Sequence, residues 1–495
     1  MTHISSGMGL RVLSTLLLAG ALAFSIVGCN TDELVRVEDP AQLKPDATAT
    51  AAAVPALVNG AIRQFEAGYS GLGDDAFISS VGVITDEFAW GDSFVTRNAA
   101  DRRTLQPAQL GNISDIAFNR LEQARMLSLR ALAAVNKFVD KVADPDADRS
   151  DLQATIGYIF LTMSEGWCGA VPFSNVPPEG DIDPNAISFG DPQSTTQMND
   201  SAVVAFDAAL AADPNNQLAM VGKGRALLNL GQYDEAEAAV ADVGDTFVYL
   251  IEHSTNTSAE NNSISSLIDN GRYTIANLEG GTTATGGALR PDTSTATTNA
   301  TAEGLPFRGA KDPRIPYVLK GGCFTASIRC WTLNNYPTFD ADVPLASGVE
   351  ARLIEAEAAM NRNDGVTMMA KLNALRAQVA SLLPLLYPQQ RQVFPLPTAG
   401  AASLAPLADP VTPDARRSLL FQERAFWLYA TGHRQGDLRR LVRNYGLPQT
   451  QVFPSGPYFR GTGGPQFGTD VAYPVPFNEE NNPQFDRAAC VTTAS

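Results

Sequence analysis

Ionisable side chains gather in one stretch near the end of the sequence, residues 419–442. They are carboxylates, guanidiniums and one imidazole, the groups that acid–base catalysis and phosphate or carboxylate recognition use. Its members are Glu423, Arg424, His433, Arg434, Asp437, Arg439 and Arg440. Two interpretations compete. The cluster is either a catalytic or ligand site, or a structural clamp that ties two helices together.

The pattern around this cluster favours the clamp. Apolar residues recur at the spacing of one buried helical stripe, at Phe421, Ala425, Leu428 and Tyr429. Gly432 permits a left-handed helix end, and we expect Asp437 to cap the helix that follows. Arg434 and Arg439 can then bind Glu423 or the free carbonyls of the first helix. These four ionisable residues form the predicted clamp.

Charge and motif content exclude several function classes. The chain has 495 residues and a formal net charge of −17, so its surface repels phosphates and we expect no nucleic-acid partner. It contains three histidines and has no H-E-x-x-H, no G-x-S-x-G and no phosphate-cradling glycine loop. We therefore expect no enzymatic activity, no cofactor and no metal site.

The first residues have the pattern of an export signal. Residues 12–27 form an apolar run shorter than the roughly 20 residues of a membrane-spanning helix. Small residues then precede Cys29, as in the cleavage box of bacterial lipoproteins. We predict a signal peptide over 1–28, lipidation of Cys29 as the membrane anchor, and a tether over 29–46. The alternative is a plain secretory peptide with an incidental cysteine.

Four cysteines remain besides the lipidation candidate, an even number that favours disulfides in an exported chain. Cys323 and Cys330 lie seven positions apart, so a local bridge between them is the first expectation. Cys168 would then pair with Cys490 by elimination. A zinc site is the alternative, disfavoured because the sequence has no C-x-x-C pair and few histidines.

Helical periodicity runs through most of the chain and indicates a mainly α-helical fold. It predicts helices near 47–68, 75–88, 112–142 and 146–166. Residues 201–243 resemble a tetratricopeptide unit, and residues 347–380 form a second candidate helix pair with a short turn. Residues 254–345 and 387–412 lack this periodicity and are predicted to be loop-rich insertions. We expect residues 47–495 to form a single domain.

The sequence also carries a resemblance to a known family. The segment "ERAFWLYATGHRQGDLRRL" resembles the C-terminal motif of the SusD/RagB family of nutrient-binding lipoproteins. Four other parts of the chain resemble family segments in the same order, namely "VRVEDP", "GAVPFS", "LIEAEAAMNRND" with "LNALRAQV", and "YPVPFNEENNPQF". Thr431 and Gln435 depart from the pattern, where an acidic and an aromatic residue are usual. The departures suggest a distant branch.

The resemblance implies both an architecture and a function. Four tetratricopeptide-like helix pairs would form a scaffold, with long loops on the other side as the ligand face. The protein would sit, anchored by lipid, on the outer-membrane surface of a Gram-negative-type bacterium. There it would pass oligosaccharides, or peptides, to a SusC-like TonB-dependent transporter without altering them. The alternatives are a tetratricopeptide scaffold that assembles envelope proteins and, more remotely, an envelope hydrolase.

A sugar-binding face needs flat aromatic rings for stacking and amides for the hydroxyl groups. Two stretches, 85–98 and 323–339, offer both. The candidate ligand-binding residues are Trp90, Phe94, Trp331, Asn334, Asn335 and Tyr336. The Cys323–Cys330 bridge would hold Trp331 in place at low entropic cost. The competing interpretation for each tryptophan is a place in the core.

Overall fold

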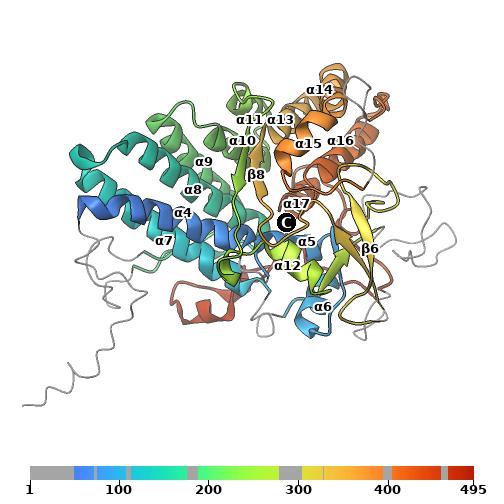
Figure 1. Cartoon of the computed structure of the whole chain (residues 1–495), viewed down its shortest axis with the longest axis horizontal. Helices are drawn as coiled ribbons and strands as arrows, with labels where there is room; N and C mark the ends of the chain where they lie inside the picture. Colours follow the sequence, from blue (N-terminus) through green and yellow to red (C-terminus); the bar gives the residue numbers. More distant parts are fainter. Residues whose placement is uncertain are drawn as a thin grey trace, which may run out of the picture. The chain divides into compact units, whose positions relative to one another are not determined.

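The computed structural model (Figure 1) describes residues 50–71, 75–106, 113–175, 188–277, 304–326, 328–393, 404–458 and 466–495. Residues Ala49–Ser495 make one compact unit by their mutual contacts. The predicted signal peptide, Cys29 and the tether lie outside the described residues. So do residues 278–303 and 394–403 of the two predicted insertions.

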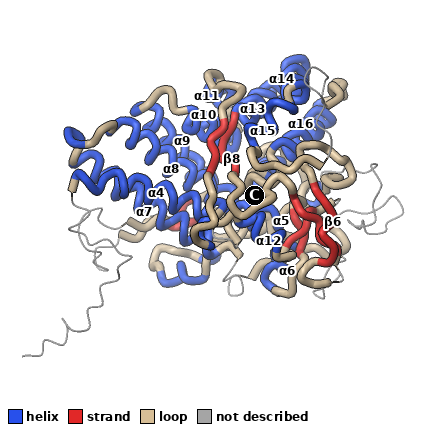
Figure 2. The backbone as a smooth tube through the Cα atoms, viewed as in Figure 1, coloured by secondary structure: helices blue, strands red, loops and turns tan. Residues whose placement is uncertain are grey.

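Eight helices pack in successive pairs and form the scaffold of the described part of the chain. They are α4 (Val54–Ser70), α7 (Asp115–Lys137), α8 (Pro145–Gly166), α9 (Thr195–Ala212), α10 (Gln217–Leu230), α11 (Tyr233–Val240), α13 (Gly348–Asn361) and α14 (Gly365–Ala377). The pairs are α4 with α7, α8 with α9, α10 with α11, and α13 with α14, and each pair also packs on the next. The mainly α-helical, four-pair scaffold is confirmed (Figure 2).

Small residues let these helices approach closely. A Cβ added to Gly157 of α8 would lie 2.6 Å from the ring of Phe206, and one added to Gly222 of α10 would lie 2.3 Å from it. The ring of this α9 residue therefore fills a space that two glycines leave open. Gly231 ends α10 with φ +77°, a conformation that suits glycine because it has no Cβ. The predicted turn between α13 and α14 is also present, and Asp364 caps α14 through the N–H of Thr367.

Short helices and two-stranded antiparallel sheets occupy the region beside this scaffold. The helices are α5 (Phe77–Ile84), α6 (Val95–Asp101) and α12 (Ser263–Asp269). The strand pairs are β1 (Phe88–Trp90) with β5 (Tyr273–Ile275), β2 (Val171–Pro172) with β3 (Pro192–Gln193), β4 (Val248–Ile251) with β8 (Val343–Ser347), and β6 (Tyr317–Gly322) with β7 (Arg329–Leu333). The helix predicted over 75–88 is therefore shorter in the structure: it spans Phe77–Ile84, the backbone is extended at Thr85, and Phe88 pairs in β1.

The C-terminal part adds α15 (Val379–Leu386), α16 (Pro413–Trp427) and α17 (Arg434–Arg443). Short 3₁₀ helices lie in the described residues at Ala51–Ala53, Val139–Lys141, Ser258–Glu260, Gln449–Gln451, Phe477–Asn481 and Arg487–Ala489. In the part of the chain that the structure describes, no helix is both long enough and apolar enough to span a membrane.

Two disulfides join distant and local parts of the chain, and both predicted pairings are present. Cys168 is bonded to Cys490, 322 positions later, and Cys323 is bonded to Cys330. The zinc alternative is therefore wrong for these four residues, because their sulfur atoms are bonded to one another. The long-range bridge ties the residues just after α8 to the C-terminal end of the chain. The backbone N–H of Cys168 also donates to the carbonyl of Tyr473.

Candidate functional site

The ionisable cluster of α16 and α17 is buried, and three of its members, Arg424, Asp437 and Arg440, pair with one another. Asp437 accepts hydrogen bonds from Nε and Nη2 of Arg424, both at 2.8 Å, and from Nη2 of Arg440 at 2.9 Å. Arg440 also donates to both carboxylate oxygens of Glu357 in α13, at 2.8 and 2.9 Å. Burial by itself raises the pKa of Asp437, but the two guanidiniums outweigh it and hold that pKa well below its ordinary value.

Two other arginines of α17 bind partners far away in the sequence. Arg434 donates to both oxygens of Asp86, at 2.7 and 2.9 Å. Arg439 donates through Nη1 to the carbonyls of Ser164, Glu165 and Trp167, at 2.7 to 3.0 Å, where α8 ends. Neither arginine binds Glu423 or the carbonyls at the end of α16, the partners that the sequence suggested. They attach α17 to α8 and to the segment after α5.

Two further details of the predicted clamp are different in the structure. Glu423 binds Arg314 and Arg376, with a shortest N–O distance of 2.7 Å to each. Asp437 does not cap α17, because the helix begins three residues earlier, after His433, and its carboxylate faces the guanidiniums. The whole cluster is less than a tenth exposed. It joins helices and offers no surface to a ligand.

Three of the predicted ligand-binding residues are buried. Tyr336 is 2% exposed and donates its hydroxyl to the carbonyl of Ala430 at 3.2 Å, and Asn335 is 1% exposed and donates to the carbonyl of Arg314 at 3.0 Å. Trp90 lies in β1 and is 8% exposed. Their burial removes these side chains from direct contact with a ligand, since no face of them is free for stacking.

Trp331 and Asn334 are half-buried on the hairpin of β6 and β7. The ring of Tyr317 packs edge-on against Trp331 at 5.5 Å, and the guanidinium carbon of Arg308 lies 4.7 Å from the Trp331 ring centroid. Leu319, which pairs with Trp331 across the hairpin, is 51% exposed. Part of the tryptophan is accessible beside an apolar neighbour, but its ring is already covered on one face.

The most exposed aromatic rings near the candidate stretches are Phe94 and Phe324, at 48% and 55%. Arg272 lies between them, with its guanidinium carbon 5.3 Å from the ring centroid of Phe94 and 4.0 Å from that of Phe324. Val95, 76% exposed, continues the patch. We call these four residues the aromatic surface. It combines two accessible rings with a cationic hydrogen-bond donor, a combination that can both stack on a ligand and hydrogen-bond it.

A buried carboxylate fixes the aromatic surface from below. Asp92, whose side chain is fully buried, accepts from Arg272 at 2.9 Å and from Arg97 at 2.6 Å. Arg97 in turn binds Asp75 at 2.8 Å and lies 5.1 Å from the ring centroid of Phe94. Because each guanidinium is held by a carboxylate, both cations keep a fixed position beside the rings.

The Cys323–Cys330 bridge holds Phe324 in this arrangement. The N–H of Phe324 donates to the carbonyl of Gly271 at 3.0 Å, and the N–H of Thr325 donates to that of Gly91 at 2.9 Å. A Cβ on Gly91 would lie 2.7 Å from the sulfur of Cys323, so the tip of the hairpin fits here only against glycine. The bridge thus positions its neighbour Phe324, a residue that sequence analysis did not select.

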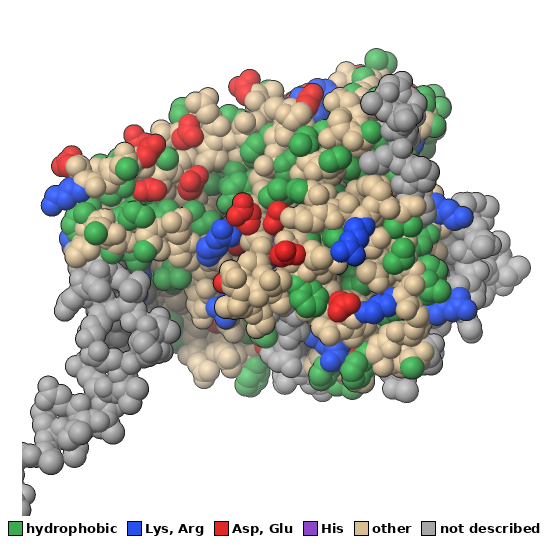
Figure 3. Space-filling view, in the orientation of Figure 1, with side chains coloured by type: hydrophobic (Ala, Val, Ile, Leu, Met, Phe, Trp, Pro, Cys, Tyr) green, Lys and Arg blue, Asp and Glu red, His purple; other side chains and the backbone are tan. Residues whose placement is uncertain are grey.

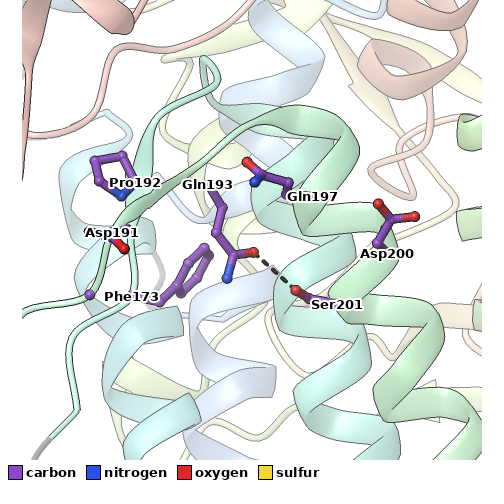
Figure 4. Close-up of a pocket in the computed structure, with 8 residues that line it drawn as sticks. Phe173, Asp191, Pro192, Gln193, Gln197, Asp200 and Ser201 are labelled. Carbon is purple, nitrogen blue, oxygen red and sulfur yellow. Dashed lines mark hydrogen bonds between the residues drawn. The ribbon is translucent and has the colours of Figure 1, made fainter.

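A separate cavity of about 450 Å³ lies between α9 and the strands β2 and β3 (Figure 4). It is lined by Phe173, Gly190, Asp191, Pro192, Gln193, Gln197, Asp200 and Ser201. Gln193 accepts a hydrogen bond from Ser201 at 3.0 Å, and the Phe173 ring is 5% exposed because it packs on Phe160. The cavity offers polar groups but no accessible ring for stacking.

Comparisons with known proteins identify the fold. A tetratricopeptide repeat family model matches residues 197–247, which include α10 and α11. A crystal structure of a SusD superfamily protein from Bacteroides fragilis superposes with a TM-score of 0.59 and 12% identity, covering 88% of this chain and 99% of its own. A SusD-like carbohydrate binding protein from Bacteroides vulgatus superposes with a TM-score of 0.57 and 13% identity, covering 88% of this chain and 97% of its own. Bacteroides fragilis NanU superposes with a TM-score of 0.54 and 13% identity, covering 90% of this chain and 98% of its own.

No curated protein matches the chain at the level of sequence. At identities of 12 to 13% the structural likeness establishes the fold and not the ligand. The predicted resemblance to SusD/RagB proteins is therefore confirmed for the fold: the chain has the SusD fold over most of its length.

Proposed function

We propose that this protein is a lipid-anchored surface protein that binds oligosaccharides and delivers them to a SusC-like TonB-dependent transporter in the outer membrane. In this proposal Cys29 carries the anchor, and the protein performs no chemistry on its ligand. The SusD fold, the ordered family segments and the apolar run before Cys29 support it. One of the fold neighbours is described as a carbohydrate binding protein and another as a putative sugar binding protein.

The observation that carries the proposal is the aromatic surface. Phe94 and Phe324 expose about half of each side chain, and Arg272 offers N–H donors between them. Sugar rings have apolar faces that stack on phenyl rings and hydroxyls that accept from a guanidinium. In this proposal Trp331 and Asn334 extend the ligand face along the β6–β7 hairpin, and the buried Trp90 supports it from β1, which pairs with β5 next to Arg272.

A glycan array on the full-length chain tests this proposal. The protein is purified in a polyoxyethylene detergent, because detergents with sugar headgroups would compete for the site. The glycan that binds most tightly on the array is then titrated into the wild-type protein, Phe324→Ala and Phe477→Ala. Phe477 is 52% exposed on its 3₁₀ helix and provides a matched control.

The expected loss follows from exposed area. A phenylalanine side chain has about 200 Å² of surface, of which 55% is free at Phe324, so a sugar covering half of this buries about 55 Å². At about 25 cal/mol per Å² that contributes about 1.4 kcal/mol, or about ten-fold in Kd. The proposal requires a ten-fold weaker Kd for Phe324→Ala and an unchanged Kd for Phe477→Ala. Equal affinities in all three proteins would move the site away from the aromatic surface.

The second candidate function is a tetratricopeptide scaffold for envelope proteins, favoured by the repeat match over residues 197–247. It predicts binding through the helix pairs and no glycan recognition. A peptide array on the same protein distinguishes it from the first proposal. Peptide binding that Phe324→Ala leaves intact, together with no glycan binding, would support the scaffold.

A further inference from the structure

A second cavity, of about 370 Å³, opens where the end of α4 meets the chain that follows β4. Its lining residues come from two short stretches, Arg63, Glu66, Ala67 and Gly71 on one side and Ile251, Glu252, His253, Ser254, Asn256, Ala259 and Glu260 on the other. Its volume falls within the roughly 300–1,000 Å³ of typical small-molecule sites. Figure 3 shows acidic side chains gathered beside a basic one between α4 and α12, the region to which these stretches belong.

The lining of this cavity carries more negative than positive charge. The lining holds three carboxylates, those of Glu66, Glu252 and Glu260, and one guanidinium, that of Arg63. Arg63 lies 2.9 Å from Glu66 and 3.6 Å from Glu252, and 58% of its side chain is exposed to solvent. Three carboxylates against one guanidinium leave a formal charge of −2 when all are ionised.

Glu66 forms the buried wall of the cavity. It is 7% exposed, and its second carboxylate oxygen has only a long contact, 3.4 Å from the hydroxyl of Tyr249. Burial raises the pKa of Glu66 to about 7, although Arg63 opposes this shift. A carboxylate in this condition gains from a cation that replaces the water it has lost.

His253 contributes no compensating positive charge. Its Nδ1 lies 3.0 Å from the carbonyl oxygen of Glu260, which can only accept, so the ring carries its proton there. Its Nε2 then accepts from the hydroxyl of Ser70 at 3.0 Å. Burial lowers the pKa of His253, so the imidazole is neutral near pH 7 and both its nitrogens are occupied.

We propose that this cavity binds the primary ammonium group of a small molecule, with Glu66 as its buried partner and Glu252 and Glu260 at the opening. An ammonium group carries three donors on one compact charge, so it can bind Glu66 while other acceptors of the lining or water take its remaining donors. A divalent metal ion fits less well, because it needs several converging ligands and the described residues hold no group of three or more His, Cys, Asp or Glu side chains placed to bind one. The cavity is separate from the aromatic surface, and the inference does not depend on glycan binding there.

Two matched pairs of probes test the proposal and distinguish an amino sugar from a lysine-like amine. Glucosamine is compared with glucose, and Nα-acetyl-lysinamide with Nα-acetyl-norleucinamide, by calorimetric titration of the full-length chain in polyoxyethylene detergent at pH 7. We expect at least one of the two amines to bind at least about ten-fold more tightly than its uncharged match. If neither amine binds more tightly than its match, the proposal is wrong.

Variants separate this cavity from other parts of the surface. Glu66→Gln keeps the size of the side chain and removes its charge, and Ala67→Leu fills the cavity without changing charge. Each should weaken the amine about ten-fold or more, while Glu480→Gln, an exposed acid paired with Arg487, should not. The thermal unfolding of each variant is first compared with that of the wild type, so that loss of fold is distinguished from loss of binding. Amine binding that survives both cavity variants would overturn the proposal.

Discussion

Asp437→Asn tests whether the α16–α17 cluster is a structural clamp. The carboxylate accepts three hydrogen bonds from Arg424 and Arg440, all between 2.8 and 2.9 Å, at a position 3% exposed. The amide keeps one acceptor oxygen, loses the negative charge, and turns an NH2 group toward a guanidinium. Both arginines then remain buried with part of their charge uncompensated.

Removing one partner of a buried ion pair typically costs about 3–5 kcal/mol. That loss is large beside the roughly 5–15 kcal/mol by which native proteins are stable. Asp414→Asn is the matched control. Asp414 pairs with Arg417 at 3.0 Å, but its side chain is 85% exposed, so solvent screens the pair and the expected loss is at most about 1 kcal/mol.

The assay is urea unfolding followed by tryptophan fluorescence and by circular dichroism, whose transitions must coincide for a free energy to be extracted. The account requires a loss of about 3–5 kcal/mol for Asp437→Asn and a much smaller one for Asp414→Asn. Similar, small losses in both proteins would refute it. They would show that the cluster does not hold the helices together.

Acid should produce the same loss in the wild-type protein. Because the folded pKa of Asp437 lies below the ordinary aspartate value of 3.8, its contribution is complete above that pH. It is lost as the pH falls from about 4 through the folded pKa. Asp437→Asn should therefore show a weaker pH dependence of unfolding than wild type below about pH 4.

Three other predictions address separate parts of the structure. Replacing Cys323 and Cys330 by serine should weaken glycan binding several-fold in calorimetry, because the hairpin tip is released; an unchanged Kd would contradict the positioning role of the bridge. Burial raises the pKa of Glu87 to about 8, so the wild type should lose stability relative to Glu87→Gln as the pH rises from 5 to 8. If the urea midpoints of the two proteins change by the same amount over this pH range, the prediction is wrong. Gly432→Ala should lower the free energy of unfolding by about 1–3 kcal/mol, because φ is +84° and the new Cβ would lie 2.8 Å from the hydroxyl of Tyr69; an unchanged urea midpoint would contradict it.

The long helices could be predicted because their apolar residues repeat over many turns. Residues 347–380 show this clearly, since α13 and α14 fall within them with the turn where it was expected. The short strands could not be predicted in the same way. Strands of three residues, such as β1 and β5, are too short to show an alternating pattern, and their pairing joins positions 88–90 to 273–275.

The partners of buried charges also escaped prediction, for a related reason. The sequence places Arg434 near Glu423, but the fold brings it to Asp86, 348 positions earlier. Local spacing restricts which side chains share a helix face and says little about which distant helix will lie against it. The sequence therefore predicted that charges gather here, but not which pairs they form.

The candidate site shows the same limit. Three segments, near residues 91–95, 271–272 and 323–325, meet at the aromatic surface through tertiary contacts alone. Phe94 was selected from its own stretch, whereas Arg272 stands in a segment with no feature that relates it to either ring. The position of Phe324 beside a bridged cysteine was the one indication in the sequence.

Hydrogen–deuterium exchange with the strongest glycan from the array tests the central claim most directly. The full-length chain is compared with and without glycan, and protection is mapped along the sequence. Binding at the aromatic surface predicts slower exchange in residues 91–98, 270–273 and 322–326, and little change elsewhere. Protection confined to the helix pairs around residues 217–240, or no protection at a saturating glycan concentration, would contradict it.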